Sequence, residues 1–242
     1  MADLIYRTVI NDIKNRIFNN EFKDNKLPDE RSLSESYKVS RSTIKRALDL
    51  LVQQGVVFKK RGSGTFINPL YLKNQSLFQY EGNNLGVTDN IITTGHESNI
   101  QLLEYHVTPA SAEIQQNLFL NENEFVYQIK RLRLIDGEPI IIETGFIPIK
   151  LAPELSPDTV KSSIFNFIDK QEHKRVSKSF MSIMAEPSTE EDQQLLNLKP
   201  TEPVGIMAGT FFLDDGTPFE FSTMRIHYKY LNYNTFINLN SD

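Results

Sequence analysis

The sequence predicts an α+β protein made of two dissimilar parts. Its 242 residues are 39% hydrophobic and 24% charged, which is typical of a folded protein, and the length suits a small module followed by a medium one. Residues 1–68 show helical periodicity and carry a net charge of +5, from 13 Lys and Arg against 8 Asp and Glu. The rest is strand-rich and carries −10, from 13 against 23. The basic part is therefore the one expected to attract a polyanion.

Three amphipathic helices are expected in the first 68 residues. Apolar residues recur every fourth position over residues 5–17, which predicts the first helix. Asp29 supplies a cap for a short second helix whose apolar side lies within residues 33–37. After a turn at residues 38–40, Ser40 suits the N-cap of a third helix with its apolar face over residues 44–52.

Basic and hydroxyl side chains crowd the start of the third helix and the segment after Gly55. Residues 56–60 and 64–67 predict two short strands around a glycine-rich basic turn, and its glycines let a backbone approach DNA closely. The N-terminal residues of a recognition helix face base edges in the major groove. The predicted DNA contacts are Arg41, Ser42, Thr43, Lys45, Arg46, Lys60, Arg61, Gly62 and Gly64. The alternative is a solvated basic face, but the order of these elements favours a winged helix-turn-helix DNA-binding domain over residues 1–68.

The elements after residue 68 are mixed. Residues 69–79 lack a clear period and are interpreted as a linker to a domain over residues 80–242. Strands are expected at residues 99–107 and 125–135, and helices at residues 110–118, near 164–168 and at 190–198. This order predicts an α+β domain built around an antiparallel sheet.

Two Asp-Gly hairpins recur in this domain, at residues 134–139 before Glu143 and at residues 212–218 before Glu220. Asp-Gly suits a two-residue type I′ turn. With a strict two-residue turn, Arg131 opposes Ile142, and Glu143 lies opposite Lys130 on the other face of the sheet. Only a bulge would bring Glu143 to the face of Arg131. For Glu220, no such register argument speaks against a place in the site.

Arg131 and Arg133 lie two residues apart on one strand and therefore share a face with apolar residues. They either pair with nearby carboxylates as a structural salt bridge or bind an anionic ligand, and adjacent guanidinium groups favour a phosphate or carboxylate. Glu143 and Glu220 are candidates for sugar hydroxyls or an amine. Further candidate contacts are Thr88, Ser163, Arg225 and Tyr230, with Ser163 at a helix N-terminus that suits an anion.

The N-terminal segments resemble the GntR family of bacterial regulators. They are residues 27–33 (LPDERSL), 39–48 (VSRSTIKRAL) and 61–67 (RGSGTFI). The resemblance implies operator contacts at Arg31, Arg41, Thr43, Lys45 and Gly62. The family usually has Ser where Asp29 stands and often Arg at the Lys45 position. Since lysine lacks the guanidinium fork, the operator sequence does not follow from the resemblance.

Residues 80–235 resemble the UTRA effector domain of the HutC branch of that family. The matching residues are 86–88 (GVT), 131–133 (RLR), 136–139 (DGEP) with Glu143, 162–165 (SSIF) and 216–220 (GTPFE) with Arg225. The resemblance implies a chorismate lyase-like fold, a homodimer, and a small effector that is often a sugar phosphate. Phe165 stands where relatives have Tyr, so a ring hydroxyl contact is lost. The resemblance also favours repression over activation.

Several function classes are excluded or disfavoured. The chain has no cysteine, which removes disulfides, thiolate metal sites and cysteine nucleophiles. It has neither a signal-like N-terminus nor an 18-residue apolar run, so the cytoplasm is the expected location. Its four histidines lack metal-ligand spacing, and we expect no metal, no cofactor and no enzymatic activity. The sequence thus predicts a transcriptional regulator, acting as a dimer on pseudo-palindromic operator DNA under control of a small anionic effector. The alternatives are a chorismate lyase-like enzyme and an effector-independent DNA-binding dimer.

Overall fold

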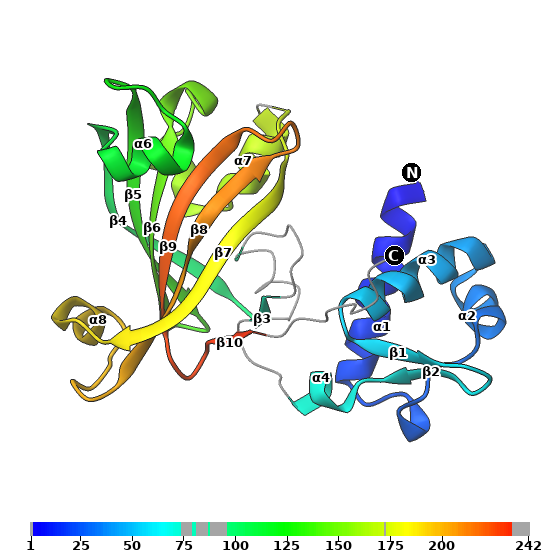
Figure 1. Cartoon of the computed structure of the whole chain (residues 1–242). Helices are drawn as coiled ribbons and strands as arrows, with labels where there is room; N and C mark the ends of the chain where they lie inside the picture. The colour runs from blue at the N-terminus through cyan, green and yellow to red at the C-terminus, as the bar shows by residue number, and fades with distance from the viewer. Residues whose placement is uncertain (1, 74–78, 81–86, 88–95, 172, 234–242) are drawn as a thin grey trace. The chain divides into compact units, whose positions relative to one another are not determined.

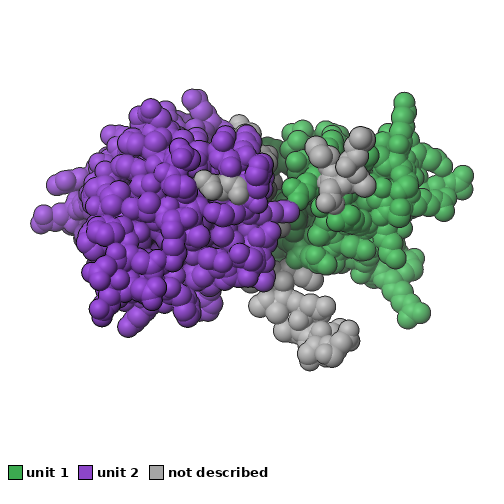
Figure 2. All heavy atoms as spheres, turned by 90° about the horizontal axis from the view of Figure 1, so that it is seen from above, with its two compact units in different colours: residues 1–82, 233–242 green, residues 83–232 purple. Residues whose placement is uncertain are grey.

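The computed structural model describes residues 2–73, 79–80, 87, 96–171 and 173–233 (Figure 1). The chain divides into two compact units, residues 1–82 with 233–242 and residues 83–232, which Figure 2 colours separately. The first unit is mainly helical and the second contains a six-stranded antiparallel sheet, so the predicted α+β class is confirmed. Among the described residues, no helix is both long and apolar enough to cross a membrane.

The helices of the first unit begin where their predicted caps lie. They are α1 (Ala2–Phe18), the short 3-10 helix η1 (Lys23–Asn25), α2 (Glu30–Tyr37) and α3 (Arg41–Gln53). The Asp29 carboxylate accepts a hydrogen bond from the Ser32 amide at 2.8 Å, and the Ser40 hydroxyl accepts one from the Thr43 amide at 3.2 Å. Lys38 ends α2 in the left-handed conformation, with φ of 53°, and so turns the chain toward α3.

A two-stranded hairpin follows α3 and completes the winged helix-turn-helix. Strands β1 (Val57–Lys60) and β2 (Gly64–Ile67) pair antiparallel, and Gly62 in the connecting turn has φ of +73°. The apolar faces of α1, α2 and α3 meet in one core, which Ile67 of β2 also joins. Residues 69–79, expected to be a linker, begin with helix α4 (Pro69–Lys73), whose Tyr71 and Leu72 pack against that core. The packing of these two side chains thus adds a helix beyond the hairpin to the core of the first unit.

The second unit is built on a sheet with strand order β4-β5-β6-β9-β8-β7. Its strands are β4 (Ser98–Pro109), β5 (Phe125–Ile135), β6 (Glu138–Pro148), β7 (Val176–Pro187), β8 (Pro203–Leu213) and β9 (Pro218–His227). The helical segments are α6 (Ala112–Leu118), α7 (Ile164–Gln171), α8 (Glu190–Leu195), η2 (Ile149–Leu151) and η3 (Thr159–Lys161). Two short strands, β3 (Gln79–Tyr80) and β10 (Asn232–Tyr233), pair with each other.

Helices cover both faces of the six-stranded sheet (Figure 1). On one face, η3 and α7 pack on an apolar cluster that includes Tyr127, Ile129 and Phe219. On the other face, α6 packs near Val126 and α8 packs near Leu132. The face beneath η3 and α7 is the one that carries the two arginines, because Tyr127, Ile129, Arg131 and Arg133 alternate with the residues of the opposite face.

A β-bulge follows each Asp-Gly hairpin. In the first, Asp136 and Gly137 have φ of 51° and 85°, which agrees with the predicted two-residue type I′ turn. The strict register expected from that turn is wrong, because Arg133 pairs with Ile141 while Leu134 pairs with Pro139. The extra residue between these pairs, Ile140, shifts the register by one. A bulge of this kind changes which face the following side chains occupy.

The second hairpin differs from the prediction at its turn. The Leu213 amide donates to the Thr217 carbonyl at 2.9 Å, and Gly216 has φ of +88°, so three residues rather than two form the tip. Beyond it, Phe211 pairs with Glu220 while Phe212 pairs with Pro218. The extra residue, Phe219, is fully buried in the cluster beneath α7. This second bulge places Phe219 and Glu220 on the same face of the sheet.

Candidate DNA interface and effector site

The start of α3 presents an ordered polar surface. Arg41, Ser42 and Lys45 are exposed, and Thr43 is half-buried. The Ser40 hydroxyl lies 2.8 Å from the hydroxyls of both Ser42 and Thr43. One cap residue therefore organises the hydroxyl groups of the first helical turn while also receiving a backbone amide. Preordering of these groups lowers the entropy cost of binding a partner.

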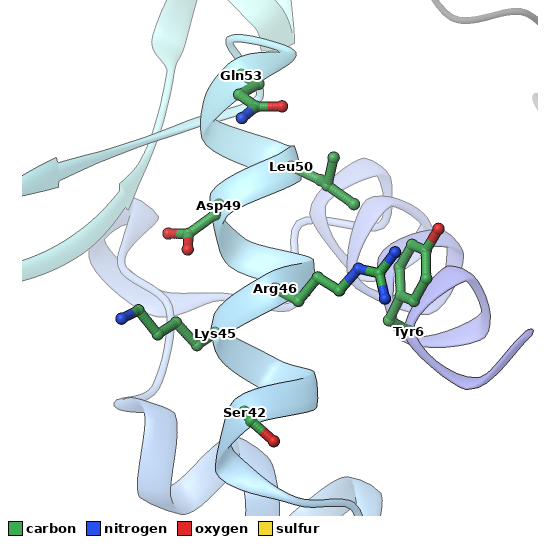
Figure 3. Close-up of a pocket in the computed structure, with 7 residues that line it drawn as sticks. All are labelled: Tyr6, Ser42, Lys45, Arg46, Asp49, Leu50 and Gln53. Carbon is green, nitrogen blue, oxygen red and sulfur yellow. The ribbon is translucent and has the colours of Figure 1, made fainter. Parts of the chain in front are cut away.

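Arg46 lies on the side of α3 that faces α1. Its guanidinium carbon is 4.2 Å from the centroid of the Tyr6 ring, a cation–π contact that holds the exposed arginine in place (Figure 3). A shallow pocket follows this side of α3, and its lining residues are Tyr6, Ser42, Lys45, Arg46, Asp49, Leu50 and Gln53. Sequence reasoning missed the role of Tyr6, since its position in the apolar stripe of α1 indicated only a core residue.

The tip of the wing carries Lys60, Arg61, Gly62 and Gly64, all of them exposed. Gly64 has φ of +117°, and a Cβ there would lie 3.0 Å from Cε of Lys26, so glycine suits this position on both counts. The tip and the start of α3 together hold most of the predicted DNA contacts.

Two cations next to this surface form ion pairs. Lys59 on β1 of the wing lies 2.7 Å from the Asp49 carboxylate and 3.6 Å from that of Glu30. Arg31 on α2 is exposed and forms an ion pair of 3.0 Å with Glu35 one helical turn later. An exposed pair of this kind contributes only about 0.3–0.5 kcal/mol, so DNA phosphate could replace Glu35 as the partner of Arg31 at little cost.

Four buried charged residues form the centre of the second unit's candidate site. Arg133 Nε donates to Glu143 Oε2 at 2.7 Å, and Arg131 Nη2 lies 2.9 Å from the same oxygen. Arg131 Nη1 also donates to the carbonyl of Val160 at 3.0 Å. Glu220 completes the group, and all four residues are at most 6% exposed. The bulge after Pro139 therefore brings Glu143 to the arginine face, as the sequence argument required of a bulge.

The surroundings shift the pKa values of the two glutamates of this cluster in opposite directions. Burial by itself raises the pKa of Glu143, but attraction to Arg131 and Arg133 outweighs it and lowers the pKa to about 2. Burial and repulsion by the Glu143 carboxylate raise the pKa of Glu220 to about 7. Glu143 is the ionised partner of both arginines, and Glu220 is the proton-holding carboxyl beside them. Below about pH 7 the four residues carry a net positive charge.

Two small residues beside Glu220, Gly145 and Ser222, shape the site. Neither was among the residues predicted from the sequence. A Cβ on Gly145 would lie 2.5 Å from Glu220 Oε1, so only glycine leaves room for that carboxyl in this position. Ser222 is 1% exposed, and within the described structure its hydroxyl has no hydrogen-bond partner. A buried polar group without a partner is costly unless a water or ligand satisfies it. The strand period could have indicated both, because each lies two residues after a candidate glutamate.

The remaining effector candidates divide between the site and other places. Ser163 lies at the start of α7, where its hydroxyl accepts from the Asn166 amide at 3.3 Å. The ring of Phe165 packs edge-on against Phe211 and Phe219, with centroids 5.1 and 6.3 Å away, so it fills the apolar side of the site. Thr88 lies outside the described residues.

Arg225 and Tyr230 are not brought to this cluster. Arg225 pairs with Ile142 on the opposite face of the sheet, and its Nε and Nη2 donate to the two oxygens of Asp192 at 2.7 and 2.8 Å. Tyr230 lies in the turn after β9, packed edge-on to His227. Arg225 was predicted to contact the effector together with Arg131 and Arg133, but the structure places it on the other face of the sheet, with its guanidinium fork occupied by a buried carboxylate.

The UTRA domain model matches residues 93–231, and the model for bacterial regulatory proteins of the gntR family matches residues 5–67. The chain belongs to the GntR family of bacterial regulators. Its second unit contains a UTRA domain, which in this family binds a small effector. The regulator therefore combines an operator-binding head with an effector-binding domain.

Named relatives agree with this membership. The regulator is 34% identical over 221 residues to the HTH-type transcriptional regulator GmuR of Bacillus subtilis. These aligned residues cover 91% of this chain and 92% of that protein. It is 30% identical over 219 residues to the Escherichia coli mannosyl-D-glycerate transport/metabolism system repressor MngR, at 90% and 89% coverage. The HTH-type transcriptional repressor NagR of B. subtilis is 28% identical over 219 residues, at 89% and 87% coverage.

A solved structure agrees as well. The possible transcriptional regulator YydK from B. subtilis superposes with a TM-score of 0.79 at 25% identity, covering 97% of this chain and 99% of that one. The three relatives are named as transcriptional regulators or repressors, which bears out the expectation that this chain is a regulator rather than an enzyme.

Proposed function

We propose that this GntR regulator is a homodimeric repressor that leaves its operator when a phosphorylated sugar binds among Arg131, Arg133, Glu143 and Glu220. Two winged heads occupy the two half-sites of a pseudo-palindrome, and the effector changes the distance between them. Residues 1–68 serve as the DNA-binding domain, residues 69–79 connect it, and residues 80–242 form the effector and dimerisation domain. The relatives MngR and NagR, both named as repressors, support the repressor assignment.

The observation that carries the effector proposal is the sharing of one carboxylate oxygen by two buried guanidinium groups. Arg131 and Arg133 both reach Glu143 Oε2, at 2.9 and 2.7 Å. Glu220 adds no full negative charge near neutral pH, because its pKa is raised to about 7 by burial and by Glu143. Two adjacent guanidinium groups that converge on one carboxylate oxygen form a double fork, which suits a phosphate or carboxylate.

The neighbouring groups suit the two ends of a sugar phosphate. Arg131 Nη1 also lies 3.3 Å from the Ser162 carbonyl, so the N-terminus of α7 and its cap residue Ser163 lie next to the arginine. A phosphate would meet both a cation and helix N–H groups there. The Ser222 hydroxyl and the protonated Glu220 carboxyl would pair with sugar hydroxyls, and Phe165 would contact a sugar carbon face.

The proposed operator contacts are Arg31, Arg41, Ser42, Thr43, Lys45, Arg46, Lys60, Arg61, Gly62 and Gly64. Arg41 and Lys45 lie one helical turn apart on the exposed start of α3 and are the candidates for base edges. The wing tip and Arg31 would contact phosphates. Because Arg46 is held against Tyr6, it is placed for a phosphate at the edge of the groove.

Calorimetry on the full chain tests the effector proposal. A panel of hexose 6-phosphates is titrated beside the matched unphosphorylated sugars, and binding is expected for a phosphorylated member only. Arg133→Ala should abolish that binding, whereas Lys150→Ala, at an exposed cation of the same domain, should not. The operator is selected from random DNA by the full chain, and the binding sugar phosphate should weaken operator affinity at least tenfold. An operator affinity unchanged at saturating sugar phosphate would contradict the regulatory mechanism and favour an effector-independent DNA-binding dimer.

A further inference from the structure

The outer edge of β7 is the surface that the proposed function leaves unexplained. β7 is the last strand in the sheet order and pairs with β8 on one side; within the described residues, no strand pairs with its other side (Figure 1). From Lys178 to Pro187 that pairing is regular, so the outer edge is long and unbroken. Along it, Phe180 is 70% exposed, Met184 46% and Ile183 38%. A long apolar edge strand is a template for pairing with another strand.

The opposite edge of the same sheet, formed by β4, is protected against pairing with another strand. β4 is interrupted by a register shift between Leu102 and Glu104. Its exposed side chains include Gln101 and His106, and Val107 is the exposed large apolar residue at its end. Bulges and polar side chains are the usual means by which proteins prevent edge pairing. From Lys178 to Pro187, β7 has no register shift, and its charged side chains there, Lys178 and Glu186, lie at the two ends of the stretch, so its edge is suited to a partner strand.

We propose that β7 pairs antiparallel with β7 of a second copy, about a two-fold axis at Ser182, and so joins two six-stranded sheets. This inference rests on the proposed homodimer and assigns its surface. In this register, Phe180 lies opposite Met184 of the partner subunit, and Lys178 lies opposite Glu186 of the partner subunit. Opposite charges and apolar pairs directly across a sheet are each worth about 0.2–1 kcal/mol, and the two-fold axis forms every such pair twice.

Symmetry limits the registers that compete with this one. A two-fold axis perpendicular to the sheet keeps each face on its own side, so paired residues must come from the same face and the axis must pass midway between one residue and its own copy. An axis at Met181 places Lys178 opposite Met184, and an axis at Ile183 places Phe180 opposite Glu186. Both oppose a charge to an apolar side chain. The axis at Ser182 alone matches charge with charge and apolar with apolar, with Met181 opposite Ile183 on the second face.

Single cysteines test the register directly, because the full chain contains none of its own. Ser182→Cys places a thiol beside the axis, where it would face its own copy at the distance of directly paired strand residues, about 4.5–5.5 Å between Cβ atoms. Mild oxidation or a short bismaleimide at micromolar protein is expected to give a band of twice the chain mass on a denaturing gel. Val107→Cys, at an exposed apolar position of the other edge, is the control and should remain at single mass.

Mass measurement in solution supplies the second arm. Unmodified chain should be dimeric by light scattering, and Phe180→Glu should shift it to monomer by at least tenfold in Kd, whereas Val107→Glu should not. A monomeric unmodified chain would overturn the proposed homodimer together with this interface. A dimer that survives Phe180→Glu and does not cross-link through Ser182→Cys would overturn the β7 interface alone.

Discussion

Arg131 on β5 and Glu143 on β6 lie directly opposite each other, with Nη2 and Oε2 2.9 Å apart. The pairing depends on Ile140, the extra residue of the bulge, because in the strict hairpin register Glu143 would lie on the other face of the sheet. Arg133 reaches the same carboxylate oxygen from two residues further along β5. One inserted residue thus creates the ionic centre of the UTRA domain.

Glu143→Gln should destabilise the UTRA domain strongly. It leaves two buried guanidinium groups without their ionised partner, and breaking a buried pair in this way costs about 3–5 kcal/mol. Glu220 is expected to ionise in response, because the arginines then attract its proton-free form without opposition from Glu143. The double variant Glu143→Gln/Glu220→Gln should therefore lose more free energy of unfolding than the two single variants together. Urea unfolding of all four proteins measures this, and simple additivity would rule out the coupling.

Glu220→Gln should remove a pH dependence from stability. The folded protein holds the Glu220 proton up to a pKa of about 7, whereas the unfolded chain releases it near the usual 4.5. The folded state binds more protons between these values, so the free energy of unfolding falls as pH rises from about 4.5 to 7 and the contribution is flat above. The Gln variant lacks this fall and should be more stable than the parent at pH 8.

Urea unfolding between pH 5 and 8 checks this, with Glu154→Gln at an exposed glutamate as the control. Glu143 acts in the opposite direction: its pKa is lowered to about 2, so its stabilising contribution is lost only as pH falls below about 4.5. Parallel profiles for parent and Glu220→Gln across pH 5 to 8 would mean that Glu220 is already ionised in the folded domain.

Local patterns were enough to predict most elements but not the register that builds the site. The strand at residues 125–135 and the caps Asp29 and Ser40 follow from neighbouring residues, because period and capping are local properties. The extra residues Ile140 and Phe219 are each fully buried. Their positions are set by packing between segments distant in sequence, which no local pattern contains.

Arg225 is a second residue whose position local sequence patterns could not predict. Its place after the second hairpin suggested the effector site, yet its partner is Asp192, 33 residues away at the start of α8. Which face of β9 a side chain occupies depends on the bulge at Phe219, and which helix covers that face depends on the chain's path. Residue type and spacing therefore identified the candidates, and only the tertiary structure could separate Arg225 from Arg131.

Gly145→Ala should impair effector binding more than it impairs folding. The new Cβ would lie 2.5 Å from Glu220 Oε1, so the carboxyl must move, while the nearest Ser222 atom at 3.8 Å is at ordinary contact distance. Crowding of this kind costs about 1–3 kcal/mol of stability. Affinity for the sugar phosphate should fall at least tenfold in calorimetry. In a Glu220→Ala background, which removes the crowded carboxyl, the same substitution should change neither quantity much; an equal loss in both backgrounds would assign the effect to the backbone instead.

Ser40→Ala should lower both the stability and the operator affinity of the DNA-binding domain. It removes the cap of α3 and the common partner of the Ser42 and Thr43 hydroxyls, at a cost of about 1 kcal/mol in thermal or chemical unfolding. Operator affinity should fall further than stability does, because the first turn of α3 loses its order. Ser36→Ala, at an exposed serine of α2, is the matched control. Equal operator affinities for the parent and Ser40→Ala would exclude the start of α3 from the interface.

Arg41→Ala and Lys60→Ala should separate base reading from phosphate contact. Arg41 lies at the exposed start of α3, so its loss should cost about 1–3 kcal/mol on the selected operator and relax the preference at one base pair. Lys60 lies on the wing, so its loss should weaken binding to all sequences alike and lower the slope of log affinity against log salt by about 1. Anisotropy titrations at several salt concentrations, on the operator and on a shuffled duplex, measure both effects. If Arg41→Ala weakened the two duplexes equally, the recognition helix would be binding DNA through the backbone alone.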